Sequence, residues 1–322
     1  MSRPRILLTR RWPAPVEAAL AAEFDATFNP ADQALDSAAL RQALRDFDAV
    51  LPTVSDRIDA AVFDLDAPRV RILANYGVGY SHIDLAAARA RGIAVTNTPG
   101  VLTDATADLT MTLLLMAARR AGEGERELRA GRWAGWRPTH LIGTQVSGKT
   151  LGIVGMGRIG RAVAQRASHG FGMKILFHNR SRLGAEALGK LKASQCELDE
   201  VLRRADFVSL HCPGGAENRH LINAERLAAM PAHAFLINTA RGEVVDEAAL
   251  AAALRQGRIA GAALDVYEHE PHVEPDLLKL ENVVLLPHLG SATAETRIAM
   301  GMRALDNLRA FFAGKQPPDL VR

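Results

Sequence analysis

The fold is decided by the stretch Leu151-Gly152-Ile153-Val154-Gly155-Met156-Gly157-Arg158-Ile159-Gly160. A short apolar run leads directly into a G-x-G-x-x-G pattern, and the residues after it have helical spacing. A buried strand, a tight glycine turn and a helix in this order are typical of the turn that binds a dinucleotide pyrophosphate. The stretch predicts an α/β domain with a dinucleotide site. The candidate cofactor-binding residues here are Gly155, Gly157, Arg158, Ile159 and Gly160. A purely structural glycine turn is the alternative.

Apolar runs alternate with alanine-rich helical segments on both sides of this turn. The runs before it cover residues 6–8, 49–51, 72–74 and 93–95. The run at 151–154 and those at 175–177, 207–210, 235–237, 262–264 and 283–286 form a second series of about six. Continuous apolar strands that alternate with helices predict parallel sheets covered on both faces. The expected class is α/β, with two Rossmann-like parallel-sheet domains, the first of them flavodoxin-like.

Two long helical patterns predict how the domains connect. Residues 103–120 follow a Thr-Pro-Gly turn signal, and residues 292–312 end the chain's regular pattern. We expect the last helix to return to the first domain. The predicted domains are therefore a discontinuous substrate domain, residues 1–99 with 290–322, and a dinucleotide-binding domain, residues 100–289.

Composition excludes several other classes of protein. The 322 residues are 48% hydrophobic and 23% charged with a net charge of +3, which argues against a disordered chain and against nucleic acid as a partner. Two cysteines, Cys196 and Cys212, predict no disulfide framework, no metal site and a reducing, cytoplasmic location. The longest apolar stretch, residues 109–118, is too short for a bilayer, and the first residues lack a signal-peptide pattern, so no membrane partner is expected.

The residues after the second strand of the nucleotide domain bear on the choice of cofactor. They are Asn179-Arg180-Ser181-Arg182, whereas an NAD site usually has an Asp or Glu here for the ribose hydroxyls. A carboxylate would repel a 2′-phosphate, which Asn179 and Ser181 can bind and Arg180 and Arg182 can clamp. The sequence favours NADP, with NAD possible. The alternative is that both arginines are solvated loop residues.

Three polar residues follow strands of the second series: Arg241, Glu270 and His288. Ligands of open α/β sheets bind outside the carboxyl ends of the strands, where these residues are expected. Arg241 can orient an anionic substrate, and His288 can deliver a proton near neutral pH. A neighbouring Glu270 carboxylate would favour protonated His288. Each residue taken alone could equally be structural.

The chain resembles the D-isomer-specific 2-hydroxyacid dehydrogenases, within them the glyoxylate/hydroxypyruvate reductase group. The matching stretches are residues 148–160, 230–250, 261–271 and 287–293, together with 75–80. The resemblance implies an NAD(P)-dependent enzyme that reduces small 2-oxo acids to D-2-hydroxy acids through a His–Glu proton relay, as a homodimer. A non-catalytic NAD(P)-sensing interaction protein on the same fold is the alternative.

The resemblance also implies roles for individual residues. Arg241, Glu270 and His288 match the catalytic residues, and Val78 and Gly79 match positions whose N–H groups bind the substrate carboxylate, together with Arg241. Further cofactor-binding positions are Thr106, His211, Cys212, Pro213, Thr239, Ala240, Asp265, His288 and Gly290. Asn218 departs from the family pattern, in which a threonine is usual near this position.

Overall fold

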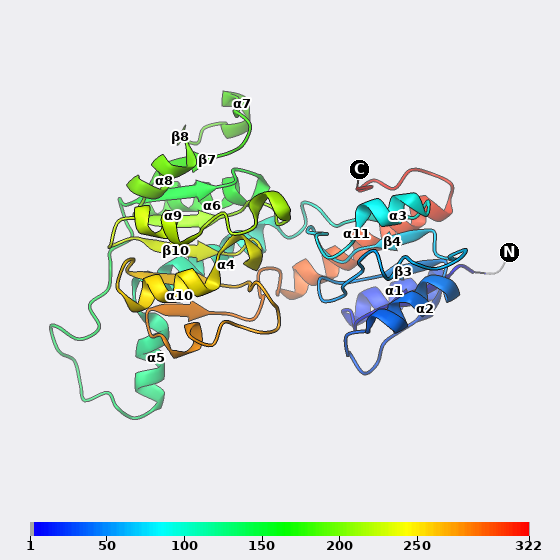
Figure 1. Ribbon diagram of the computed structural model, residues 1–322, viewed down its shortest axis with the longest axis horizontal. Coiled ribbons are helices and arrows are strands. Elements are labelled where there is room, and N and C mark those ends of the chain that lie inside the picture. The colour runs from blue at the N-terminus through cyan, green and yellow to red at the C-terminus, as the bar shows by residue number, and fades with distance from the viewer. Residues whose placement is uncertain (1–2, 322) are drawn as a thin grey trace. The chain divides into compact units, whose positions relative to one another are not determined.

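The computed structural model describes residues 3–321. It divides into two compact units, residues 1–102 with 292–322 (unit 1) and residues 103–291 (unit 2). The predicted boundaries, after residues 99 and 289, lie slightly before the observed ones. Each unit contains one parallel sheet with helices packed on it (Figure 1). The predicted fold class is confirmed.

Unit 1 contains a five-stranded parallel sheet in the order β2-β1-β3-β4-β5, which is the flavodoxin-like order. Its strands are β1 (Arg5–Leu8), β2 (Asp25–Thr27), β3 (Ala49–Leu51), β4 (Ile72–Ala74) and β5 (Ala94–Thr96). The central strands β3 and β4 are buried throughout. The edge strand β2 was not predicted, because its three residues have no apolar run and two of them are exposed.

Four helices cover the sheet of unit 1: α1 (Ala14–Glu23), α2 (Ser37–Asp46), α3 (Leu85–Ala90) and α11 (Ala294–Phe312). Helices α2, α3 and α11 each have an N-cap side chain that accepts the backbone N–H of the residue three positions later. These N-cap residues are Asp36, Asp84 and Thr293. Helix α11 packs on β4 and α1. Helix α11 therefore belongs to the same unit as the first strands of the sequence.

Unit 2 contains a seven-stranded parallel sheet in the order β12-β11-β10-β9-β6-β7-β8. Its strands are β6 (Thr150–Val154), β7 (Lys174–His178), β8 (Ala193–Gln195), β9 (Phe207–Leu210), β10 (Phe235–Asn238), β11 (Gly261–Leu264) and β12 (Val283–Leu285). From β6 the chain adds β7 and β8 on one side of the sheet and then β9 to β12 on the other side. Ligands of such sheets bind at the point where the strand order reverses, which here is between β6 and β9. The sequence predicted about six of these strands; it missed β8, a polar edge strand.

The helices of unit 2 are α4 (Thr103–Ala118), α5 (Ala121–Arg129), α6 (Arg158–Phe171), α7 (Ala185–Leu188), α8 (Leu198–Arg204), α9 (Ala224–Ala229) and α10 (Glu247–Arg255). Short 3-10 turns are η1 (Ala216–Asn218), η2 (Gly242–Val244) and η3 (Leu277–Lys279). Two apolar cores lie on the sheet, one under α4 and α6 and the other under α8, α9 and α10. The buried strands β9, β10 and β11 separate these cores.

Within residues 3–321, no helix combines the length and hydropathy needed to cross a bilayer. No group of three or more His, Cys, Asp or Glu side chains in that range is placed to hold a metal ion.

Candidate active site

His288 and Glu270 form a hydrogen-bonded pair in unit 2. Nδ1 of His288 lies 2.9 Å from Oε2 of Glu270, and both side chains are about one-third exposed (29% and 32%). The other oxygen of Glu270, Oε1, accepts the backbone N–H of Tyr267 at 3.0 Å. With Nδ1 engaged, Nε2 is the imidazole nitrogen left to exchange a proton with a substrate.

The backbone at His288 is unusual, because its φ of +55° is in the left-handed region. Asp265, buried after β11, holds this turn. Its Oδ1 accepts the N–H of Leu289 at 2.6 Å, and its Oδ2 accepts the N–H of Gly290 at 2.8 Å. Burial raises the pKa of Asp265 above its ordinary value, although both N–H groups act in the opposite direction. Asp265 thus positions His288 by binding the backbone of the two residues that follow it.

The loop that carries Glu270 packs closely on the turn after β10. A Cβ on Gly242 would overlap the carbonyl group of Tyr267, so this approach needs glycine. Glu247, the first residue of α10, accepts the N–H of Glu268 at 2.6 Å. The Glu270–Pro271 peptide bond is cis. Burial by itself would raise the pKa of Glu270, but the hydrogen bond and charge of His288 outweigh it, and the pKa is lowered.

Arg241 leaves the same turn with most of its donors available. Its Nη1 donates to the carbonyl of Ala240 at 2.6 Å. Asn238 holds the turn, donating to the carbonyl of Arg241 and accepting the N–H of Ala240. Within residues 3–321 the guanidinium has no carboxylate within ion-pair distance. Burial lowers its pKa from the ordinary value, but arginine stays charged, so Arg241 is a cation with free donors that could bind an anionic ligand.

The glycine turn at the end of β6 has the shape that a pyrophosphate site needs. Gly155 has a φ of +97°, and a Cβ there would lie 2.7 Å from backbone atoms of His211 and Cys212. A Cβ on Gly157, in contrast, would meet nothing within 4 Å. Helix α6 begins at Arg158 with no side-chain cap, and its first N–H groups precede the helical hydrogen bonds. Open space beside free N–H groups fits a phosphate.

The four residues predicted to contact a 2′-phosphate follow β7. Asn179 donates to the backbone carbonyl and the hydroxyl of Ser181, both at 3.2 Å. Arg180, Ser181 and Arg182 are exposed. Arg180 forms an ion pair with Glu217 of η1. The predicted residues therefore share one loop next to the glycine turn, and Glu217 is a charge that the sequence reasoning missed.

Comparisons with known proteins agree with this geometry. The family model for the NAD-binding domain of D-isomer specific 2-hydroxyacid dehydrogenases matches residues 111–290. A glyoxylate reductase from Thermococcus kodakarensis is 49% identical over 99% of this chain and 96% of its own length.

This chain belongs to the D-isomer-specific 2-hydroxyacid dehydrogenases. Solved structures agree. A putative member from Polaromonas gives a TM-score of 0.91 at 39% identity, covering 99% of this chain and all of that one. The NADPH-dependent glyoxylate/hydroxypyruvate reductase from Sinorhizobium meliloti, in complex with NADP and malonate, gives 0.88 at 37% identity, covering 99% and 97%. The protein is an NAD(P)-dependent dehydrogenase, and the predicted family is confirmed.

Several further predicted cofactor positions of the dehydrogenase lie together beside His288. Thr106 of α4 donates its hydroxyl to the carbonyl of Gly290 at 3.0 Å. Thr110, which the sequence reasoning missed, bonds the hydroxyl of Thr239 at 2.9 Å and the carbonyl of Thr106. These contacts place Thr106, Thr239 and Gly290 in one cluster with Asp265. Ala240 is the next residue along from Thr239.

Predicted positions after β9 form the wall beside the glycine turn. His211 bonds the hydroxyl of Ser209 at 2.8 Å, and burial lowers its pKa to about 3. Burial raises the pKa of Cys212 to about 11. His211 is therefore neutral and Cys212 is a thiol at neutral pH, so neither is suited to carry charge in the reaction. Pro213 accepts the side-chain amide of the buried Asn218 at 2.9 Å, so Asn218 has a structural contact.

In unit 1, Val78 and Gly79 lie in the loop after β4. Asn75 donates its amide to the carbonyls of Gly77 and Gly79, at 3.1 and 3.0 Å, and Asn97 donates to the carbonyl of Val78 at 2.8 Å. In a trans peptide the N–H points away from the preceding C=O. Holding these carbonyls therefore turns the N–H groups of Val78 and Gly79 outward. The sequence reasoning did not identify Asn97.

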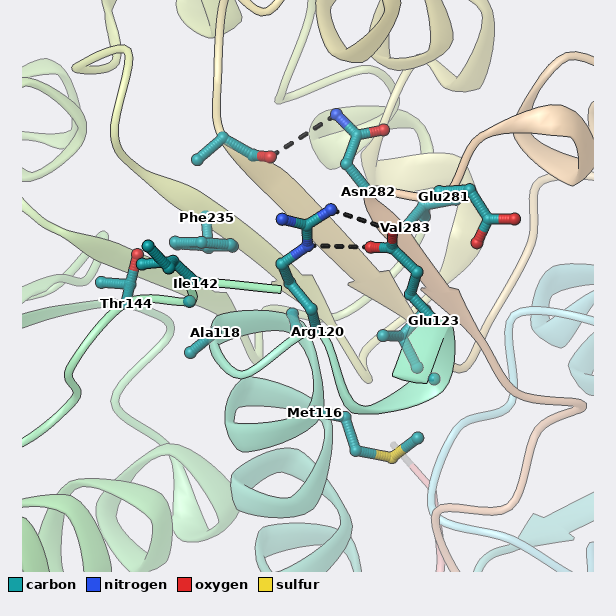
Figure 2. Close-up of a pocket in the computed structure, with 15 residues that line it drawn as sticks. Met116, Ala118, Arg120, Glu123, Ile142, Thr144, Phe235, Glu281, Asn282 and Val283 are labelled. Atoms are coloured by element: carbon teal, nitrogen blue, oxygen red, sulfur yellow. Dashed lines mark hydrogen bonds and ion pairs between the residues drawn. The ribbon is translucent and has the colours of Figure 1, made fainter. Parts of the chain in front are cut away.

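A cavity of about 420 Å³ in unit 2 lies away from these residues (Figure 2). Its wall includes the end of α4, the start of α5 and the amino ends of β10 and β12. Arg120 and Glu123 form an ion pair on it at 2.8 Å. The catalytic candidates instead follow the carboxyl ends of the strands. The cavity is therefore at the opposite edge of the sheet, and no sequence motif predicts it.

Proposed function

We propose that this dehydrogenase reduces glyoxylate, hydroxypyruvate and similar small 2-oxo acids to D-2-hydroxy acids, with NADPH preferred to NADH. The observation that carries the proposal is the Glu270–His288 hydrogen bond of 2.9 Å. Arg241 lies near this pair, since its positive charge contributes to lowering the pKa of Glu270. Relatives named glyoxylate reductase, along 99% of this chain, support the choice of substrate.

The proposed mechanism assigns one task to each residue. The bound nicotinamide supplies a hydride for carbon 2 of the oxo acid. Arg241 binds the carboxylate and carbonyl oxygens, and the N–H groups of Val78 and Gly79 bind the carboxylate. Nε2 of His288 gives its proton to the oxygen that becomes the hydroxyl. Glu270 completes the proposed proton relay by accepting the hydrogen bond from Nδ1 and holding the imidazole in place for that transfer.

The proposed cofactor site combines the glycine turn with its neighbouring loops. The N–H groups of Arg158 and Ile159 would bind the pyrophosphate at the start of α6. Asn179, Ser181 and the two arginines would bind the 2′-phosphate. Preference for NADPH is supported by the lack of any acid at the end of β7. The remaining positions proposed to line the cofactor are Thr106, His211, Cys212, Pro213, Thr239, Ala240, Asp265, His288 and Gly290.

The alternative of a non-catalytic NAD(P)-sensing interaction protein finds less support. The hydrogen-bonded Glu270–His288 pair and the available donors of Arg241 are the groups that reduction of an oxo acid requires. The curated relatives that match the whole chain are named as reductases.

We also propose that the dehydrogenase forms a homodimer in the cytoplasm. Helix α5 and residues 130–149 extend from the sheet of unit 2 (Figure 1). This segment, the arm, exposes Leu128, Trp133, Trp136 and Ile142 by 52% to 82%. Large exposed apolar side chains gathered on one segment are typical of an interface, and a second copy is the proposed partner. Both cysteines are free thiols, as expected in a reducing compartment.

The test is a panel of 2-oxo acids assayed with NADPH and with NADH, on the wild type and on the double variant Arg180→Ala/Arg182→Ala. We expect glyoxylate and hydroxypyruvate among the best substrates, and the double substitution to raise the KM for NADPH about five- to a hundredfold more than that for NADH. Equal effects on both cofactors would remove the 2′-phosphate clamp. Absence of turnover with every oxo acid would refute the proposed reaction.

A further inference from the structure

One ion pair joins the two loops that flank the proposed cofactor site. It connects Nη1 of Arg180, in the loop after β7, with Oε2 of Glu217, in η1 after β9. Strands β7 and β9 are the two neighbours of β6 in the sheet. The pair therefore connects loops on either side of the Gly155 turn.

The loop that carries Arg180 is held from β8. The side chain of Gln195 donates to the carbonyls of Asn179 and Ser181, at 3.2 and 3.0 Å, and accepts the N–H of Leu183 at 3.0 Å. One amide thus fixes the backbone on both sides of Arg180. The arginine side chain itself is 67% exposed.

The loop that carries Glu217 is held in the same way. Glu243 accepts the N–H of Gly215 at 2.6 Å, and the buried Asn218 donates to the carbonyl of Pro213. The Glu217 side chain is 77% exposed. The backbones of both loops are therefore fixed, and the Arg180 and Glu217 side chains form their ion pair at the exposed surface, where a ligand could replace either partner.

We propose that Glu217 is a specificity-determining residue that weakens the preference for NADPH. The proposal rests on the proposed function, in which Arg180 and Arg182 bind the 2′-phosphate. A phosphate monoester carries a charge of about −1.5 to −2, so it competes with Glu217 for Arg180 and is repelled by the carboxylate. NADH has hydroxyls at this position and meets neither effect. Glu217 therefore lowers the affinity for NADPH relative to NADH.

Arg182 differs from Arg180 in this respect. Within residues 3–321 it has no carboxylate within ion-pair distance, although it lies in the same loop. The guanidinium of Arg182 can therefore bind a 2′-phosphate directly, whereas that of Arg180 must first break its ion pair with Glu217. An exposed ion pair is weak, typically below about 1 kcal/mol, so the phosphate can displace it.

The test compares Glu217→Gln with the wild type by titration calorimetry with NADP⁺ and with NAD⁺, and by steady-state kinetics with both reduced cofactors. We expect the ratio of affinities, NADP⁺ over NAD⁺, to rise about three- to tenfold, with kcat unchanged. The increase should shrink in the Arg180→Ala background and at high salt. Glu200→Gln is the matched control, because Glu200 pairs with Arg204 on α8 and lies before β9.

The outcomes separate this inference from the proposed function. An unchanged ratio in Glu217→Gln, with a ratio that falls in Arg180→Ala, overturns the role of Glu217 and leaves the arginine clamp in place. A ratio that is unchanged in both variants overturns the clamp and the inference together. A rise of equal size in Glu200→Gln shows a general charge effect and also overturns the inference.

Discussion

His288 occupies a backbone conformation that disfavours any residue with a Cβ. A φ of +55° costs about 1 kcal/mol or more, and such strain persists only where neighbouring groups enforce it. Asp265 enforces it by accepting two consecutive N–H groups, those of Leu289 and Gly290. Asp265 was predicted as a cofactor contact; its observed contacts make it a positioning residue for His288 as well.

Replacing Asp265 with Asn should therefore damage catalysis and stability together. The amide keeps one acceptor, so one buried N–H loses its partner, which costs about 1–3 kcal/mol. We expect kcat to fall at least about tenfold. Thermal unfolding and kcat should be measured side by side. Asp319→Asn is the control: Asp319 is buried in unit 1 and bonded to Arg303, so stability should fall while kcat is retained. Full activity in Asp265→Asn would contradict the positioning role.

The pKa of Glu270 indicates how pH should affect reduction. It is lowered, against the effect of burial, by the hydrogen bond and positive charge of His288. The same hydrogen bond joins this ionised carboxylate to the imidazole that supplies the proton for reduction, and Glu270→Gln removes the negative charge from that contact. In Glu270→Gln we expect the alkaline limb of the kcat/KM profile to move to lower pH, and kcat to fall about 10- to 100-fold.

A second Glu–His pair provides the control for that experiment. Glu127 lies 3.0 Å from Nε2 of His140 on the arm, away from the glycine turn and the strand ends. Glu127→Gln should leave the pH profile unchanged. If the profile of Glu270→Gln matched that of the wild type, the proton relay would be wrong.

At the scale of elements, the loop after β4 shows how side-chain amides can prepare an anion site. Asn75 is almost fully buried (1% exposed), and its orientation is supported by His82, whose Nε2 lies 3.0 Å from Oδ1 of Asn75. Asn97 binds the carbonyl between the two that Asn75 holds. Three carbonyls point inward as a result, and the N–H groups that follow them point outward.

Replacing Asn75 with Ala should weaken substrate binding selectively. Without its amide the N–H groups of Val78 and Gly79 lose their common orientation. We expect the KM for the oxo acid to rise about 5- to 50-fold, while the KM for NADPH stays within about twofold. Asn29→Ala is the control, because Asn29 also bridges two carbonyls, those of Thr9 and Gln33. A change in both KM values of Asn75→Ala would indicate general disorder rather than this role.

The exposed arm is the surface on which the proposed dimer depends. Trp136 is 82% exposed, more than any other large apolar side chain described. Trp136→Ser should raise the dimer dissociation constant at least about tenfold, since buried tryptophans commonly dominate interfaces. Sedimentation velocity over a range of concentrations measures this. Leu278→Ser, at a residue 64% exposed in η3, should have no effect. A wild-type monomer at every concentration would disprove the dimer.

Local sequence patterns were enough to predict the α/β class, the central strands and the glycine turn, and to select Arg241, Glu270 and His288 as candidate site residues. Apolar runs and a glycine pattern are local signals, which one segment carries alone. The edge strands β2 and β8 lack that signal, since their pairing depends on a neighbouring strand rather than on burial.

Which polar groups come into contact is a property of the fold. The pairing of Glu217 with Arg180, the hold of Asp265 on the His288 turn and the contact of Asn97 with Val78 join residues far apart in the chain. No local pattern encodes such contacts, because strand order brings the loops together. The sequence therefore identifies candidate reacting groups, and the fold determines their charge, orientation and partners.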